Sequence, residues 1–253
     1  MNRALGVLAA MALVASLWHL GLLDGPLLAR GGRNIGVFVA DMIPPDGSVV
    51  PTVARAMVET VEIAFAGTLL GFAGALPLAL LSTRVVGGRV TSMVLRAFLT
   101  FVRTVPSLLW AIIFVVAVGL GPAAGTLGLA LYSLGYLGKL LYEAFDGVDP
   151  EVIEATRAVG AGRLQIARHA VLPETAHIVL AQLLFVFEYN VRASSILGFV
   201  GAGGVGFYLL GYLQALQYER LLTALLVTFV VVVVIDAGST RLRRRFLLPT
   251  LGA

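Results

Sequence analysis

Long apolar segments alternate along the chain with short polar ones. A helix of about 20 apolar residues spans the hydrocarbon core of a bilayer. Six segments have a suitable length and apolar character, and they cover residues 4–23, 57–81, 98–119, 123–145, 174–197 and 219–239. The pattern therefore predicts an all-α integral membrane protein with six transmembrane helices.

The N-terminal part of the chain differs from the rest. The apolar segment 4–23 follows Arg3 as in a signal peptide, but the segment is long and no small-residue cleavage site follows it. These features predict a retained anchor helix. Residues 24–55 hold an apolar stretch that is too short to span, which predicts an interfacial helix and a loop. We therefore separate residues 1–55 from a main transmembrane domain at 56–245.

Composition supports the membrane assignment. Of the 253 residues, 59% are hydrophobic and only 13% are charged, whereas roughly 25% of an ordinary soluble domain is charged. The absence of cysteine excludes disulfides, thiolate catalysis and cysteine-ligated metals. The net charge is +4, but the basic residues lie between and beyond the apolar segments. Membrane topology therefore explains them better than nucleic-acid binding does, and lipid is the expected surrounding.

The arginines predict the orientation, because cytoplasmic loops carry an excess of basic residues. With the N-terminus inside, twelve arginines, Arg3, Arg103 and Arg245 among them, are assigned to the inside and three to the outside. The basic run at 241–245 then acts as a stop-transfer anchor. This asymmetry predicts that both termini are cytoplasmic.

Motifs for catalysis or nucleotide binding are weak or missing. Gly201, Gly203 and Gly206 match G-x-G-x-x-G, but a dinucleotide site needs a preceding strand and an acidic residue about 20 positions further on. A membrane helix is predicted before this motif, so a glycine-rich turn is the better interpretation. The sequence has no P-loop, no metal-ligand spacing of its histidines, and no paired-carboxylate or Ser/His/Asp arrangement. We expect no catalytic site, metal or cofactor on this chain.

Small residues recur in the second apolar segment. Gly67, Gly71 and Gly74 form a small-residue pattern at helical spacing. Such a pattern lets two membrane helices approach closely, so we expect a compact bundle.

Charged residues inside the apolar segments are the candidates for a solute path, because buried charges in lipid are costly. Glu188, Arg192 and Ser195 share one helical face, and Glu188 is expected to pair with Arg192. Tyr132, Tyr136, Lys139 and Glu143 form a second stripe. Two interpretations stay open: the pairs lock helices together, or they line a path for an anionic solute. The path candidates are Arg192, Glu188, Asn190, Ser194, Ser195 and Lys139.

The polar segment 146–173 predicts a helix–turn–helix on the cytoplasmic side. Asp149 is a plausible N-cap, Pro150 suits the first helical position, and acidic residues follow in the first turns. Gly160 and Gly162 interrupt the helix before a second short amphipathic one, and Pro173 is expected to begin the next span. A structured cytoplasmic pair of helices predicts a docking surface for a partner.

This segment resembles the cytoplasmic motif of ABC importer membrane subunits, which reads Glu-Ala-Ala, three residues, Gly, nine residues, Ile, one residue, Leu-Pro. The matching residues are Glu154, Ala155, Thr156, Gly160, Ala170, Leu172 and Pro173. The spacing agrees throughout. Two positions differ from the motif, since Thr156 replaces alanine and Ala170 replaces isoleucine.

Within that family, the flanking segments resemble the phosphonate importer permeases. The segments are "ETVEIAFAGTLLG" (59–71), "RTVPSLLWAIIFVVAVGLGP" (103–122), "GKLLYEA" (138–144) and "NVRASSILGFVGAGGVGF" (190–207). The resemblance covers about 45–240. Ser107 departs from it, because an acidic residue is expected after the proline.

The resemblance implies a type I importer permease fold, similar to the methionine permeases, in a bacterial inner membrane. It implies a non-enzymatic homodimer beneath an external solute-binding protein, with two ATP-binding subunits that hold ATP and magnesium. The residues implied in coupling to the ATPase are Glu154, Ala155, Thr156, Gly160, Arg163, Leu172 and Pro173. The implied solute is a phosphorus oxyanion: phosphonate, phosphate, phosphite or hypophosphite.

Three alternatives compete with this interpretation. An amino-acid or osmolyte permease of the same importer class is the nearest of them. A stand-alone secondary transporter would carry matched sequence halves with interrupted helices, and the sequence shows no such halves. A membrane enzyme would need a catalytic constellation, which the sequence lacks.

Overall fold

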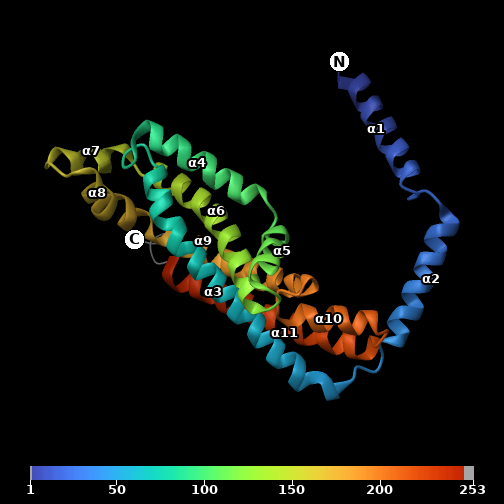
Figure 1. The fold of residues 1–253 in the computed structure, drawn as a ribbon. Coiled ribbons are helices and arrows are strands. Elements are labelled where there is room, and N and C mark those ends of the chain that lie inside the picture. The colour runs from blue at the N-terminus through green and yellow to red at the C-terminus, as the bar shows by residue number, and fades with distance from the viewer. Residues whose placement is uncertain (1, 248–253) are drawn as a thin grey trace.

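The computed structural model describes the backbone of residues 2–247 and the side chains of residues 5–244, so the side chains of Arg3 and Arg245 lie outside the described set (Figure 1). The described residues form helices and no strands. The longer helices are α1 (Asn2–His19), α2 (Gly25–Asp41), α3 (Val50–Ser82), α4 (Gly88–Thr104), α5 (Ser107–Val118), α6 (Pro122–Asp146), α7 (Pro150–Ala158), α9 (Leu172–Leu197), α10 (Val205–Gln214) and α11 (Tyr218–Leu247). A short α8 (Arg163–Ile166) precedes α9.

Helices α1 and α2 extend away from the bundle, as Figure 1 shows. Asp24 caps α2 by accepting a hydrogen bond from the backbone N–H of Leu27, at 3.1 Å. No residue of α2 is buried, and its sequence is amphipathic. Both segments are helical, and the described part of α1, Leu5–His19, is a shorter apolar helix by the same length criterion that identifies the spans.

Each of the six predicted apolar segments overlaps at least one helix, although 4–23 runs past the end of α1 at His19. By length and composition, three described helices could cross a membrane, namely Gly47–Ser82, Arg163–Val200 and Tyr218–Arg244. The pair α4 and α5 adds a fourth span if the two are counted together, but they are bent by 86° at a break next to Pro106. The predicted span 98–119 is therefore divided between two helices, because proline cannot continue α4.

Helices α3 and α6 pack closely at the centre of the bundle. A Cβ atom added at Gly71 would lie 2.6 Å from the Ser133 Cβ and 2.7 Å from the Ala130 carbonyl oxygen. At Gly67 the added atom would lie 2.8 Å from the Leu129 Cβ. The small-residue pattern therefore has the predicted packing role. α4, α5 and α9 also pack against α6, which explains why α6 tolerates more polar residues than an exposed span.

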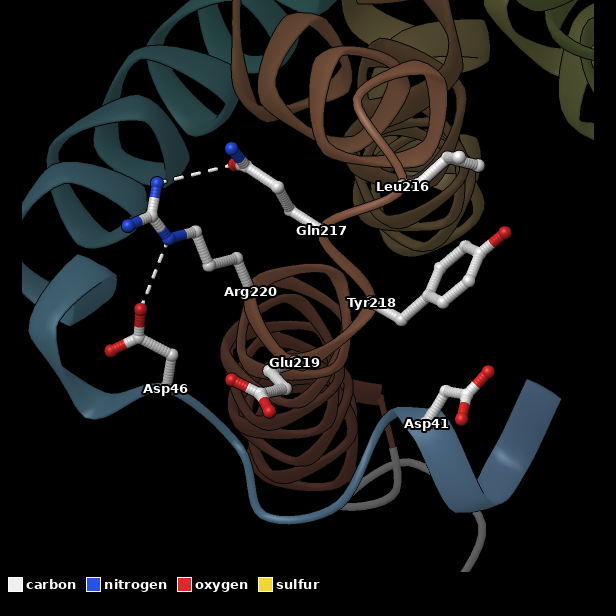
Figure 2. A pocket seen from close by; sticks show the side chains of 7 residues that line it. All are labelled: Asp41, Asp46, Leu216, Gln217, Tyr218, Glu219 and Arg220. Atoms are coloured by element: carbon white, nitrogen blue, oxygen red, sulfur yellow. Dashed lines mark hydrogen bonds and ion pairs between the residues drawn. The ribbon is translucent and has the colours of Figure 1, made fainter. Parts of the chain in front are cut away.

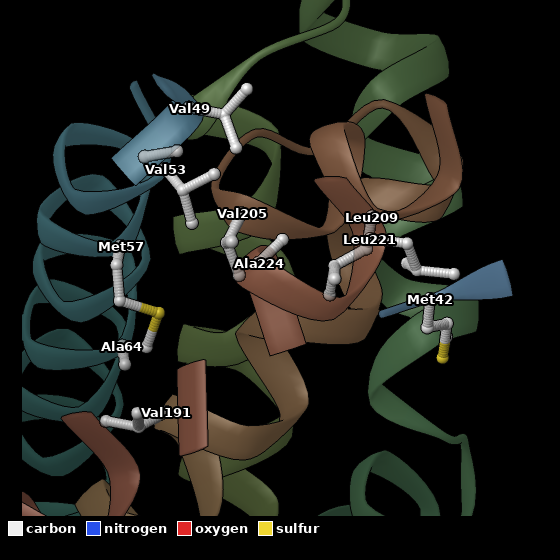
Figure 3. Packing of buried hydrophobic residues seen from close by; sticks show 11 residues of the cluster. Met42, Val49, Val53, Met57, Ala64, Val191, Val205, Leu209, Leu221 and Ala224 are labelled. Atoms are coloured by element: carbon white, nitrogen blue, oxygen red, sulfur yellow. The ribbon is translucent and has the colours of Figure 1, made fainter. Parts of the chain in front are cut away.

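Two larger apolar clusters hold the ends of the bundle. In the first, Met57 and Val53 of α3 face Val205 of α10 and Leu221 of α11, as Figure 3 shows. In the second, Leu141 and Phe145 of α6 contact the segment that leads into α9. The second cluster therefore anchors the α7–α8 loop to the bundle.

Arg96 on α4 joins three helices near that second cluster. Its Nε donates to the carbonyl oxygen of Ser82 at 2.9 Å, and its Nη2 lies 2.6 Å from Oδ2 of Asp146. Its guanidinium lies 4.8 Å from the ring centroid of Tyr142. The C-terminal ends of α3 and α6 are thus tied to α4 directly before α7 begins.

Candidate functional site

Helix α7 forms as the sequence predicts. The Asp149 carboxylate accepts a hydrogen bond from the N–H of Glu151 at 2.9 Å, and Pro150 takes the first helical position. Gly160 ends the helix with φ +85°, a left-handed conformation that glycine adopts without the steric cost of a Cβ. The N–H of Gly162 then donates to Oε1 of Gln165 at 2.7 Å, which caps the next turn.

The second helix of this loop is not separate from the following span, contrary to the prediction. α8 continues through a π-helical turn (Ala167–Val171) into α9, so that Arg163–Val200 is one long helix. Pro173 lies in the first turn of α9, as predicted, but no break in the helix precedes it. Ile166, Ala167, Ala170 and Val171 are all buried, and their packing explains why the chain stays helical between the loop and the span.

The tip of the α7–α8 loop presents an apolar and charged surface. Val159 is 84% exposed and Leu164 is 77% exposed, which is unusual for large apolar side chains on a solvated loop. The charged side chains beside them, Glu151, Glu154 and Arg157, are also exposed. We call this surface the loop tip. Its mixture of apolar and charged groups is suited to contact with another protein.

A cavity of about 580 Å³ lies at the bend between α4 and α5, and its lining is partly polar and partly apolar, with Pro106, Leu108, Ala193, Ile196 and Leu197 among the apolar residues. Its polar lining residues are Arg103, Thr104, Ser107, Tyr132, Tyr189 and Arg192. The Tyr132 and Tyr189 rings stack with centroids 5.5 Å apart and close one side of the space. We call this space the bend cavity. It contains two guanidinium groups and no lining carboxylate.

Arg192 does not pair with Glu188, which corrects the sequence prediction. Nη1 of Arg192 lies 3.0 Å from Oδ1 and 3.2 Å from Oδ2 of Asp236 on α11. Glu188 instead bonds to Arg243, also on α11. The two ion pairs join α9 to α11. Glu188 and Arg192 therefore each pair with a residue of α11 instead of with each other.

The remaining path candidates lie in different places. Asn190, Ser194 and Ser195 are buried in the bundle, and Lys139 pairs with Glu143 along α6 as its spacing predicts. Of the six candidates, Arg192 alone is among the residues that line the bend cavity. Asn190 Nδ2 donates to the hydroxyls of Thr68 and Ser133, each at 2.8 Å, and so bridges α9 to α3 and α6.

We expect Asn190→Leu to lower stability more than it lowers solute affinity. The change leaves two buried hydroxyls without their donor, and such a loss in a membrane bundle costs about 1 kcal/mol. The melting temperature of the purified protein measures the effect, with Asn34→Leu on the exposed face of α2 as the control. An unchanged melting temperature together with weakened transport would assign Asn190 to the solute path.

The glycine motif forms a tight turn, as predicted. Gly201, Gly203 and Gly204 all have positive φ, and the turn directly precedes α10. The N–H of Gly204 donates to Oε1 of Glu59 at 2.9 Å, and the N–H of Val205 donates to Oγ1 of Thr60 at 2.8 Å. Side chains of α3 therefore cap the beginning of α10, and the motif has a structural role here.

A second cavity lies at the start of α11, and Figure 2 shows it. Nε of Arg220 donates to Oδ2 of Asp46 at 3.0 Å, and its Nη1 donates to Oε1 of Gln217 at 3.2 Å. Hydrogen bonds from Ser48, followed by the interaction with Arg220, lower the pKa of Asp46 below its usual value. Asp46 thus stays charged and ties the segment before α3 to α11.

Sequence reasoning missed several residues of these sites. Arg103 was assigned to an inside loop, but it lies in the last turn of α4 and lines the bend cavity. The nearby Pro106 was the available signal, because a proline-induced bend opens space beside the preceding turn. Asp236 pairs with Arg192, 44 residues away, and Arg243 pairs with Glu188, 55 residues away. No local pattern in the sequence indicates such distant partners.

Comparison with known proteins gives consistent matches. Residues 67–247 match the family described as binding-protein-dependent transport system inner membrane component. A phosphite transport system permease protein of Stutzerimonas stutzeri is 37% identical over 247 residues, which cover 96% of this chain and 90% of that protein. A phosphate-import permease protein of Mycolicibacterium smegmatis is 37% identical over 84% of this chain and 40% of its own length.

A solved structure has the same fold. The MetNI methionine ABC transporter in an inward-facing conformation aligns with a TM-score of 0.67 at 25% identity, over 79% of this chain and 99% of the matched chain. Osmolyte permeases match more distantly, at 25% identity for a choline transport system permease protein.

Proposed function

The chain belongs to the family of binding-protein-dependent transport system inner membrane components, and from this premise we propose that it carries a phosphorus oxyanion across the membrane. It is the permease subunit of an ATP-binding-cassette importer. The oxyanion would be phosphite, phosphate, phosphonate or hypophosphite. We further propose that residues 56–245 form the transport domain and that residues 1–55 anchor it.

Two observations support the choice of solute. The relatives that cover most of this chain are named for phosphite transport and for phosphate import. The bend cavity supplies arginines and hydroxyls without a lining carboxylate, which suits an anion with several acceptor oxygens. The cavity is the single structural observation that carries the proposal, because it brings the guanidinium groups of Arg103 and Arg192 to one space at the bend between α4 and α5.

We propose that the α7–α8 loop couples this chain to a separate ATPase. Glu154 and Val159 are exposed at the loop tip, and Ile153 packs inward on the second cluster. The coupling residues from the resemblance are Glu154, Ala155, Thr156, Gly160, Arg163, Leu172 and Pro173. ATP and magnesium would bind the ATPase, and the chain itself would do no chemistry. Movement at the tip would reach the bundle through the continuous helix Arg163–Val200.

We propose that the pathway forms between two copies of the chain, below an external solute-binding protein. The bend cavity opens to the surface beside Arg192, whose side chain is 45% exposed, so a second copy would be needed to enclose a solute. The orientation with both termini in the cytoplasm places the loop tip on the side of the ATPase. Glu188, Asn190, Ser194, Ser195 and Lys139 would then support the path from within the bundle.

Uptake in whole cells tests the proposed function. A strain without its own phosphorus oxyanion importers would express the chain together with its ATPase and binding protein. We expect uptake of labelled phosphite, phosphate or methylphosphonate, and no uptake of labelled choline. Choline uptake without uptake of any phosphorus oxyanion would favour the osmolyte alternative and would refute the proposed solute.

A further inference from the structure

The two arginines of the bend cavity differ in their electrostatic state. Arg192 contacts both carboxylate oxygens of Asp236, at 3.0 and 3.2 Å, so its charge is already compensated. Among the described residues, Arg103 takes part in no ion pair, and its Nε is fully enclosed without a hydrogen-bond partner. Burying a polar nitrogen without a hydrogen-bond partner costs free energy. Of the two arginines in this cavity, Arg103 is therefore the one without a bound anionic partner.

The backbone at Arg103 is held in place by its neighbours. A Cβ atom added at Gly135 of α6 would lie 2.7 Å from the Arg103 backbone nitrogen, so the two helices touch there. The indole Nε1 of Trp110 donates to the carbonyl oxygen of Val102 at 3.1 Å and fixes the bend from the α5 side. The Arg103 side chain therefore extends from a backbone that is already fixed, and binding of an anion would not have to order that backbone.

Hydroxyl groups line part of the same space. Ser107 flanks the bend, and Tyr132 and Tyr189 contribute their stacked rings from α6 and α9. The Thr104 hydroxyl also lines the space, but it donates its proton to the carbonyl oxygen of Phe101 at 2.7 Å. Hydroxyls donate to anionic oxygens, and a guanidinium donates two parallel hydrogen bonds to an oxyanion. A tetrahedral phosphorus oxyanion has enough acceptor oxygens to meet the guanidinium and the hydroxyls together.

We propose that Arg103 is the main binding group of an oxyanion site in the bend cavity. Arg192 is the second cation of the site, and its bond to Asp236 is exchanged for one to the anion as the solute passes. The choice of a phosphorus oxyanion rests on the proposed function, whereas the cationic character of the site rests on Arg103 and Arg192 themselves.

Binding of phosphite to the complex of this chain with its ATPase tests the proposal, with the binding protein left out. Saturation-transfer NMR on the P–H proton of phosphite reports binding in lipid nanodiscs. We expect Arg103→Gln to weaken binding about tenfold or more, as for loss of a charged hydrogen bond. Arg103→Lys would give an intermediate loss, because lysine keeps the charge without the planar fork. Arg89→Gln, an exposed arginine at the start of α4, is the matched control and should bind as the native complex does.

A phospholipid headgroup also carries a phosphorus oxyanion, so the experiment must distinguish a bound solute from a bound headgroup. Two lipid compositions make that distinction. Nanodiscs of phosphatidylcholine alone are compared with nanodiscs that also contain phosphatidylglycerol. We expect the native phosphite signal in both. A signal that disappears with phosphatidylglycerol would show that headgroups fill the cavity, and it would overturn the proposal.

Equal phosphite binding by the native complex and Arg103→Gln would also overturn the proposal. Phosphite uptake is measured in parallel in vesicles with the binding protein present. Uptake that persists in Arg103→Gln at the native rate and half-saturating concentration contradicts this inference and leaves the proposed function intact. A native complex that takes up no phosphorus oxyanion contradicts the proposed function itself. If Arg103→Gln does not assemble, the Arg103→Lys complex gives the decisive comparison. The proposal requires the planar guanidinium of Arg103 to donate two hydrogen bonds to the anion, so native-like binding and uptake by Arg103→Lys would contradict it.

Discussion

Glu154→Lys is expected to abolish solute uptake while the chain still inserts into the membrane and folds. Glu154 is exposed on α7 at the loop tip, so its replacement disturbs no buried contact. A charge reversal at a protein interface places like charges together and costs several kcal/mol. Loss of the ATPase from the purified complex, together with loss of ATP-driven uptake, measures the effect. Glu174→Lys, an exposed glutamate outside α7, is the control. Intact assembly and uptake in Glu154→Lys would refute the docking role.

Gly160 gives a second test of the same surface. A Cβ at Gly160 would meet no atom within 4 Å, but the residue has φ +85°. The cost of substitution is therefore conformational: valine is disfavoured there, whereas asparagine tolerates the left-handed region. Gly160→Val should impair coupling, and Gly160→Asn should largely preserve it. Equal uptake by the two variants would show that the turn geometry does not matter for coupling.

Gly71→Ala is expected to cause the largest loss of stability. The added methyl group would lie 2.6 Å from the Ser133 Cβ and 2.7 Å from a backbone oxygen, so α3 and α6 would have to separate. Overpacking of this kind costs about 1 to 3 kcal/mol, and occasionally more. The melting temperature in detergent and the yield of monodisperse protein report the effect.

Gly238→Ala on α11 is the matched control for that variant. A Cβ at Gly238 meets no atom within 4 Å, and alanine in a helix interior is about 0.5 to 1 kcal/mol more favourable than glycine. The control should therefore be at least as stable as the native protein. If Gly71→Ala were equally stable, the close contact between α3 and α6 would be wrong.

Local patterns predicted the elements of this fold well. Apolar segment length located most of the long helices, the cap at Asp149 located α7, and the glycine spacing predicted a close helix contact on that face of α3. Each of these features depends on residues close together in sequence or on one helical face. The α7–α8 loop motif also led to the family, because its spacing is long and specific.

Contacts between distant segments were not predictable in the same way. Glu188 and Arg192 are one turn apart and could pair, yet each has a partner on α11. Periodicity within one helix carries no information on which other helix lies beside it. The assignment of Arg103 to a loop failed for a related reason, since charge counting does not show that Pro106 bends the chain back into the bundle.

The sequence predicted the start of α9 at Pro173 but not that α8 would continue into it without a break. Pro173 predicted a helix start, but burial of Ile166, Ala167, Ala170 and Val171 against the second cluster keeps the segment helical before it. Tertiary packing here keeps the chain helical up to the proline. The result is functionally relevant, because a single helix now runs from the loop tip to the level of Arg192 and the bend cavity.

ATP-driven accumulation of labelled phosphite in sealed proteoliposomes tests the central claim most directly. The vesicles would contain this permease with its ATPase, and the loaded binding protein would be added on the external side. We predict accumulation that requires ATP, that is reduced by unlabelled phosphate or phosphonate, and that is unaffected by choline. Phosphite movement that needs no ATP, or ATP-driven movement of choline but of no phosphorus oxyanion, would contradict the account.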